Sequence, residues 1–146
     1  MAHRTFFSFH YERDVWRSSI VRNSSQLNPD DRTWIEASIW EDVKPQGEAA
    51  IQRLIDNALK NTTVTAVLIG AETSSRRWVK YEIDASLARK NGLFGIYIHN
   101  IKDNAGNIDS KGINPLPPGY PAYDWVLNSG YANLGEWVDK AYDAAR

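Results

Sequence analysis

The stretch that decides the fold is Val64-Thr65-Ala66-Val67-Leu68-Ile69 (VTAVLI), followed by a polar link over 70–75 and by Trp78-Val79-Lys80-Tyr81-Glu82 (WVKYE). A continuous apolar run of this length is typical of a strand covered on both faces, as in parallel sheets. The WVKYE segment then begins a helix at the carboxyl end of that strand. Open α/β sheets bind their ligands at this edge, so the start of this helix is a candidate functional site.

On this helix Glu82 has no cation three or four positions away, since those positions hold Trp78, Val79, Ala85 and Ser86. The helix therefore offers Glu82 no local ion pair. Asp84 differs, because Lys80 lies four residues before it, and we interpret it as part of a solvated face. A carboxylate that has no local partner and lies beside a Trp at a ligand-binding edge is a candidate catalytic group. An exposed glutamate without a role is the alternative that the spacing leaves open.

The composition indicates one soluble globular domain over residues 1–146, with 42% hydrophobic and 24% charged residues. A formal charge of −1 provides no general attraction to nucleic acid or to an anionic membrane. The absence of Cys excludes disulfides, thiolate metal sites and a Cys nucleophile. Residues 1–7 do not resemble a signal peptide, and no apolar run approaches the roughly 18 residues of a membrane span. We therefore expect a cytoplasmic protein.

Strand and helix signals alternate along the chain. We expect strands over 5–9, 34–40, 64–69, 93–99 and 123–126, and helices over 14–23, 48–60, 78–90 and around 134–142. Residues 102–112 and 114–121 are too rich in Gly, Asn, Asp or Pro for either element. The pattern predicts a three-layer, flavodoxin-like α/β fold with a parallel sheet of about five strands in the order 2-1-3-4-5.

Three strand ends should meet at one edge of this sheet. They carry Ser8-Phe9-His10-Tyr11, then Trp40-Glu41-Asp42, and finally the link that leads to Trp78 and Glu82. Flat aromatic rings, hydroxyls, carboxylates and arginines together suit a nucleotide. The candidate substrate-binding residues are Ser8, Phe9, His10, Trp40, Asp42, Arg76 and Trp78. The alternative is that Phe9 and Trp40 belong to the core and that the arginines are solvated.

Several other sites are not expected. The chain has neither GxGxxG nor GxxxxGK[ST], which argues against dinucleotide-binding and P-loop motifs. A phosphoacceptor receiver domain needs an Asp at the end of the third strand, where this chain has Ile69-Gly70-Ala71. The three histidines are scattered, so we expect no metal site.

Several segments resemble the Toll/interleukin-1 receptor (TIR) family. Residues 4–11 (RTFFSFHY) resemble the first box of TIR domains, and residues 76–83 (RRWVKYEI) resemble the stretch whose glutamate, four residues after a Trp, is catalytic in NAD-consuming members. The similarity is closer to the TIR-like family that includes the Thoeris anti-phage protein ThsB. The further segments of this chain that resemble this family are 21–23 (VRN), 37–42 (ASIWED), 67–70 (VLIG), 106–108 (GNI), 111–112 (KG) and 123–126 (YDWV).

This resemblance implies a flavodoxin-like TIR fold and an enzyme that cleaves the nicotinamide–ribose bond of NAD, with Glu82 as the catalytic residue. NAD is then a substrate, and no permanently bound cofactor is expected. The ADP-ribose is converted into a signalling nucleotide, a cyclic ADP-ribose isomer or a histidine conjugate, which activates a separate effector. A phage-derived trigger and a homo-oligomer are further partners that the resemblance allows.

The chain departs from eukaryotic TIR domains in two places. His10-Tyr11 stands where they have a basic pair, and a Pro-rich segment replaces a longer insertion. These departures leave the phosphate contacts and the product open. Two other functions also stay open: a non-enzymatic TIR interaction module, and an enzyme similar to nucleoside deoxyribosyltransferases.

Overall fold

The VTAVLI segment forms the central strand of a parallel sheet. In the computed structural model, which describes residues 3–24 and 26–146, it is β3 (Val64–Ile69), and all six of its residues are buried. The other strands are β1 (Thr5–Ser8), β2 (Arg32–Thr33), β4 (Gly92–Tyr97) and β5 (Ala122–Asp124). All pairs are parallel and the order is β2-β1-β3-β4-β5, which confirms the predicted fold class and strand order. Met1 and Ala2, part of the amino end considered above, and Ser25 lie outside the described residues.

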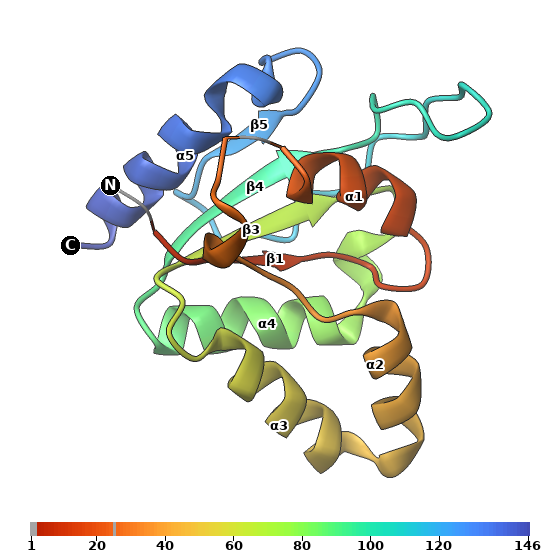
Figure 1. Ribbon diagram of the computed structural model, residues 1–146, viewed down its shortest axis with the longest axis vertical. Helices are drawn as coiled ribbons and strands as arrows, with labels where there is room; N and C mark the ends of the chain where they lie inside the picture. The colour runs from red at the N-terminus through yellow and green to blue at the C-terminus, as the bar shows by residue number, and fades with distance from the viewer. Residues whose placement is uncertain (1–2, 25) are drawn as a thin grey trace.

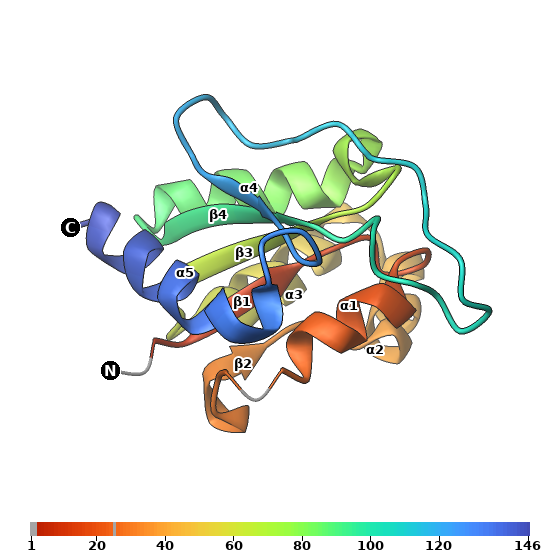
Figure 2. The same ribbon diagram turned by 90° about the horizontal axis from the view of Figure 1, so that it is seen from above.

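Helices cover both faces of this sheet (Figures 1 and 2). One face carries α1 (Val15–Arg22) and α5 (Gly130–Ala144), and the other carries α3 (Glu48–Leu59) and α4 (Arg77–Ala88). A short helix, α2 (Ala37–Val43), precedes α3 and is joined to it by a 3-10 turn, η2 (Lys44–Gln46). Two further 3-10 turns are η1 (Pro29–Asp31) and η3 (Thr73–Ser75). No helix in the described ranges is long and apolar enough to cross a lipid bilayer.

The prediction of a strand over 34–40 is wrong. The strand at this edge is only β2, whose Thr33 pairs with Phe6, and residues 37–43 form α2 instead. A strand with Trp40 on its buried face would also bury residues 36 and 38, yet both of these are exposed. The apolar residues at 34, 35, 39 and 40 follow neither strict alternation nor a single helical face, so the pattern did not decide between the two elements.

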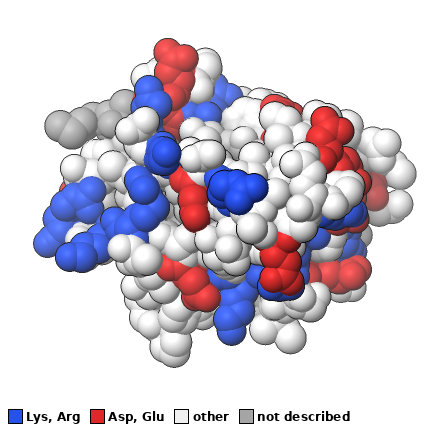
Figure 3. Space-filling view, turned by 90° about the horizontal axis from the view of Figure 1, so that it is seen from below, with Lys and Arg blue, Asp and Glu red and all other residues white. Residues whose placement is uncertain are grey.

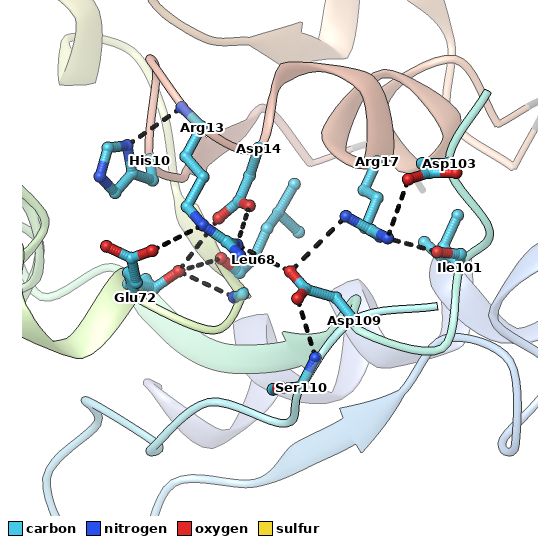
Figure 4. A network of polar contacts seen from close by, with 12 residues as sticks. His10, Arg13, Asp14, Arg17, Leu68, Glu72, Ile101, Asp103, Asp109 and Ser110 are labelled. Atoms are coloured by element: carbon cyan, nitrogen blue, oxygen red, sulfur yellow. Dashed lines mark hydrogen bonds and ion pairs between the residues drawn. The ribbon is translucent and has the colours of Figure 1, made fainter. Parts of the chain in front are cut away.

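A long segment without helix or strand, residues 98–121, connects β4 to β5 and passes the carboxyl end of the sheet (Figure 2). Arg13, just before α1, fixes it in place: its guanidinium lies 2.8 Å from Asp109, 2.9 Å from Glu72 and 3.0 Å from Asp14 (Figure 4). Asp14 is buried against Gly70, where an added Cβ would overlap its carboxylate. The carboxyl ends of β1 and β3 and this segment are therefore held together by charged contacts.

Candidate functional site

The carboxyl group of Glu82 is fully buried at the carboxyl end of β1. Its Oε1 accepts a hydrogen bond from Ser8 Oγ at 2.6 Å, and its Oε2 accepts one from the hydroxyl of Tyr11. Both donors belong to the segment at the end of β1. The interpretation of Glu82 as an exposed glutamate is therefore wrong.

The position of Glu82 follows from the face of α4 that packs on the sheet. Val79, Glu82, Ile83 and Ser86 are the buried residues of this helix, and their spacing of three and four places them on one side. Ser86 donates a hydrogen bond to the Glu82 carbonyl at 2.7 Å, which secures the helix at this point. On the strand side, Ser8 pairs in register with Val67 of β3. The rigid sheet and helix thus bring the hydroxyl and the carboxylate together.

Burial raises the pKa of Glu82 to about 7, because a charged carboxylate is poorly solvated inside the protein. The hydrogen bonds from Ser8 and Tyr11 and the positive charge of Arg76 oppose this rise. Burial also raises the pKa of Tyr11, and the neighbouring Glu82 raises it further. A carboxyl group that titrates near neutral pH is a common feature of catalytic sites.

Aromatic rings form a continuous series from the core beside Glu82 to the surface. Successive ring centroids lie 4.6 Å apart for Phe9 and Tyr11, 5.0 Å for Tyr11 and Trp40, 6.4 Å for Trp40 and Trp78, and 5.7 Å for Trp78 and Tyr81. The first three rings are each 1% exposed, whereas Trp78 is partly buried. Since Glu82 is not exposed either, a ligand can reach it only if some of these side chains move.

Arg76, which precedes the first residue of α4, places its guanidinium against the same rings. The Cζ atom lies 4.7 Å from the centroid of Trp40 and 5.6 Å from that of Tyr11. Its Nη1 lies 3.3 Å from Glu12 Oε1, and the side chain is only 10% exposed. Cations over aromatic faces are held by the ring quadrupole, and the effect is stronger where water is excluded.

The structure brings most of the predicted site residues together. Ser8, Phe9, Trp40, Arg76 and Trp78 lie in the connected group around Glu82. Trp40 is not at the end of a strand. This residue belongs to α2, and from that helix its ring packs against the other residues around Glu82.

Two predicted residues lie differently. His10 is at the edge of the group: its Nδ1 accepts a hydrogen bond from the Arg13 amide at 3.2 Å, and burial together with Arg76 lowers its pKa. Asp42 is exposed on α2, and within the described part of the chain no hydrogen bond or ion pair joins its side chain to Glu82 or its neighbours. Two residues along a helix turn the side chain by about 200°, so Asp42 faces away from the direction of Trp40.

Three residues around the site were not among the predicted site residues: Tyr11, Glu12 and Lys44. Tyr11 was expected at this edge of the sheet, as the last residue of Ser8-Phe9-His10-Tyr11, but was given no role. Tyr11 had one usable signal, because a buried Tyr hydroxyl normally finds a hydrogen-bond partner and Tyr11 follows closely after the first strand. Glu12 and Lys44, which contact each other at 3.6 Å, gave none, since they come from segments more than thirty positions apart.

Away from Glu82, the structure shows a surface of mixed charge and a cavity near the other end of the sheet. Figure 3 shows Lys and Arg side chains among Asp and Glu side chains on the face seen from below. A cavity of about 560 Å³ lies at the other end of β4, between residues such as Leu93, Tyr123 and Ala141, and does not reach Glu82. Among the described residues, no group of three or more His, Asp or Glu side chains is placed to hold a metal ion.

Comparisons with known proteins add two findings. The family described as "Thoeris protein ThsB, TIR-like domain" matches residues 6–103, a range that includes both Ser8 and Glu82. A protein of Bacillus cereus (strain MSX-D12), described as "Putative cyclic ADP-D-ribose synthase ThsB1", is 44% identical over 141 residues. This similarity covers 94% of the chain and 72% of the Bacillus protein.

Proposed function

The chain belongs to the family of Thoeris ThsB TIR-like domains, and on that basis we propose that it is an NAD-consuming enzyme. It cleaves the nicotinamide–ribose bond, as an NAD glycohydrolase or ADP-ribosyl cyclase does, and Glu82 is its catalytic residue. The observation that carries this proposal is the buried Glu82 carboxyl group, with both oxygens held by donors from the end of β1 and with a pKa of about 7.

The chemistry needs one well-placed carboxylate. When the C1′–N bond breaks, its electron pair goes to the nicotinamide nitrogen, and positive charge develops on the ribose. An ionised Glu82 stabilises this charge, as a carboxylate does in glycoside hydrolysis. The nicotinamide of NAD is already cationic and leaves as a neutral molecule, so the leaving group needs no proton donor. Ser8 and Tyr11 keep the carboxylate oriented towards the reacting atoms.

The neighbouring residues would shape the substrate pocket. Trp78, one helical turn before Glu82 and partly exposed, or Trp40 stacks on the nicotinamide ring. Phe9 and His10 line the remaining space, and Arg76 contacts phosphate. Asp42 stays a proposed contact that no interaction in the structure supports. Substrate entry requires that some of the surrounding side chains move, because Glu82 is closed off from solvent.

Once nicotinamide has left, a site that excludes water lets an internal nucleophile capture the ribose. The name of the Bacillus protein, which refers to cyclic ADP-D-ribose, favours a cyclic product. We propose a cyclic ADP-ribose isomer, and a histidine conjugate is the alternative. In Thoeris anti-phage defence the product would diffuse to a separate effector. A phage-derived trigger, a homo-oligomeric active form and a single functional domain over 1–146 belong to the same proposal.

The test is to incubate the purified protein with NAD and to measure free nicotinamide, with the nucleotide product identified by mass spectrometry. Turnover that disappears in Glu82→Gln supports the proposal. The assay is repeated in lysates of phage-infected cells, so that a required trigger is present. If nicotinamide is released under neither condition, the proposal is wrong. Base exchange on deoxynucleosides would then favour a deoxyribosyltransferase, and concentration-dependent self-association without turnover would favour an interaction module.

A further inference from the structure

The carboxylate of Glu12 lies between two cations that come from different parts of the chain. Arg76 Nη1 is 3.3 Å from Glu12 Oε1, and Lys44 Nζ is 3.6 Å from the same oxygen. Glu12 lies after β1, Lys44 is the first residue of η2, directly after α2, and Arg76 immediately precedes α4. The three segments thus meet at the Glu12 carboxylate, and Lys44 Nζ also lies 3.6 Å from Glu41 Oε2 on α2.

Beside this carboxylate, three buried donors have no acceptor. Arg76 Nε, Arg76 Nη2 and Trp40 Nε1 are inaccessible and have no hydrogen-bond partner among the described residues. The guanidinium lies 4.7 Å from the Trp40 ring centroid, so all three donors occupy one small region. Buried polar groups in proteins are nearly always paired, and a group of unpaired donors indicates a place for a ligand rich in acceptors.

We propose that Arg76, Lys44 and Trp40 form a clamp for the pyrophosphate of a dinucleotide, and that Glu12 occupies the clamp when no ligand is bound. This inference rests on the proposed function and names its phosphate contacts. A pyrophosphate carries more charge than one carboxylate and offers more acceptors, which match the planar fork of an arginine. It therefore uses the donors that Glu12 leaves unpaired.

The distance to the reacting centre suits this assignment. The Arg76 guanidinium lies 5.6 Å from the ring of Tyr11, whose hydroxyl binds Glu82. In NAD the pyrophosphate is attached to C5′ of the same ribose that carries nicotinamide at C1′, so one ring separates the two groups. Displacing Glu12 costs little, because its side chain is 44% exposed and solvated ion pairs are weak.

The experiment measures binding of ADP-ribose by isothermal titration calorimetry, which needs no turnover. Arg76→Gln should weaken binding by about tenfold or more, since charge-assisted hydrogen bonds are lost. Glu12→Gln should tighten binding, because it removes the competing anion. The matched control is Arg89→Gln, at an exposed position beyond the other end of α4, and should bind as the wild type does. Adenosine, which has no phosphate, should bind equally to the wild type and to Arg76→Gln.

Three results would overturn the clamp: wild-type protein that does not bind millimolar ADP-ribose, a folded Arg76→Gln protein with unchanged affinity, or an equal loss of adenosine binding. If Arg76→Gln does not fold, Arg76→Lys and Lys44→Gln replace it, and each should weaken ADP-ribose binding. Failure of the clamp is separable from failure of the enzymatic proposal. If Arg76→Gln releases nicotinamide with the same KM for NAD as the wild type, only the clamp is disproved. If the wild type binds ADP-ribose through Arg76 but never releases nicotinamide, only the enzymatic activity is disproved.

Discussion

Ser8 and Glu82 are 74 positions apart in the chain, yet Ser8 Oγ lies 2.6 Å from Glu82 Oε1 in the buried interior. This contact joins the last residue of the first strand to the middle of α4. It holds the carboxylate in a fixed orientation and partly compensates the cost of burying its charge.

Glu82→Gln should abolish nicotinamide release, with a rate loss on the order of 10²–10³-fold or more, because charge stabilisation at the ribose is lost. The melting temperature should not fall, since a neutral amide replaces a buried ionisable group of the same shape. Asp84→Asn is the matched control: this carboxylate is exposed on the same helix, and activity should stay near that of the wild type. Glu82→Gln protein that releases nicotinamide at a comparable rate would remove Glu82 from catalysis.

Tyr11→Phe should shift the pH dependence of nicotinamide release to higher pH. The hydroxyl donates to the ionised form of Glu82, so losing it disfavours that form and raises the pKa above about 7. The check is a pH–rate profile of kcat/KM for both proteins. A profile that keeps its midpoint while the rate falls uniformly would indicate that Tyr11 acts only through packing.

Glu82 should also make the folded protein less stable as the pH rises. Its pKa is about 7 in the folded state against an ordinary value of 4.5, so the folded protein binds the proton more tightly than the unfolded chain does. The stabilising contribution is complete below pH 4.5 and is lost as the pH rises to about 7. At about 1.4 kcal/mol per pH unit this amounts to something on the order of 3 kcal/mol. Denaturant titrations give the free energy of unfolding of the wild type and of Glu82→Gln between pH 4 and 8. As the pH rises, this free energy should fall in the wild type relative to Glu82→Gln. A constant difference between the two proteins would contradict the prediction.

Trp78→Ala should lower NAD turnover less than Glu82→Gln does. Removing the ring weakens binding or orientation of nicotinamide, so the main effect should be on KM for NAD. Thermal melting is measured alongside, because Trp78 also packs against Trp40 and Tyr81. A large fall in melting temperature together with an unchanged KM would assign Trp78 to the core and not to the site.

The sequence was sufficient for the β3–α4 unit because two local patterns agree there: an uninterrupted apolar strand, and a helix whose buried positions recur every three or four residues. It was insufficient at 34–40, where the edge strand β2 has only two residues and α2 carries the Trp that the pattern assigned to a strand. The contact between Glu12 and Arg76 spans 64 positions and has no local signature, so only the folded arrangement reveals it.

The segment that carries Tyr11 and Glu12 is anchored at both ends. Ser8 is fixed in the sheet, and Asp14 is packed against Gly70 and bound by Arg13. The residues between them form a short loop whose two ends stay at a fixed separation. Exchange of Glu12 for a ligand is then a local excursion of a few residues, of the kind that loops complete in nanoseconds to microseconds. Such an exchange is far faster than the turnover of most enzymes. It would therefore determine whether Glu12 or the ligand occupies the clamp, without limiting the turnover rate.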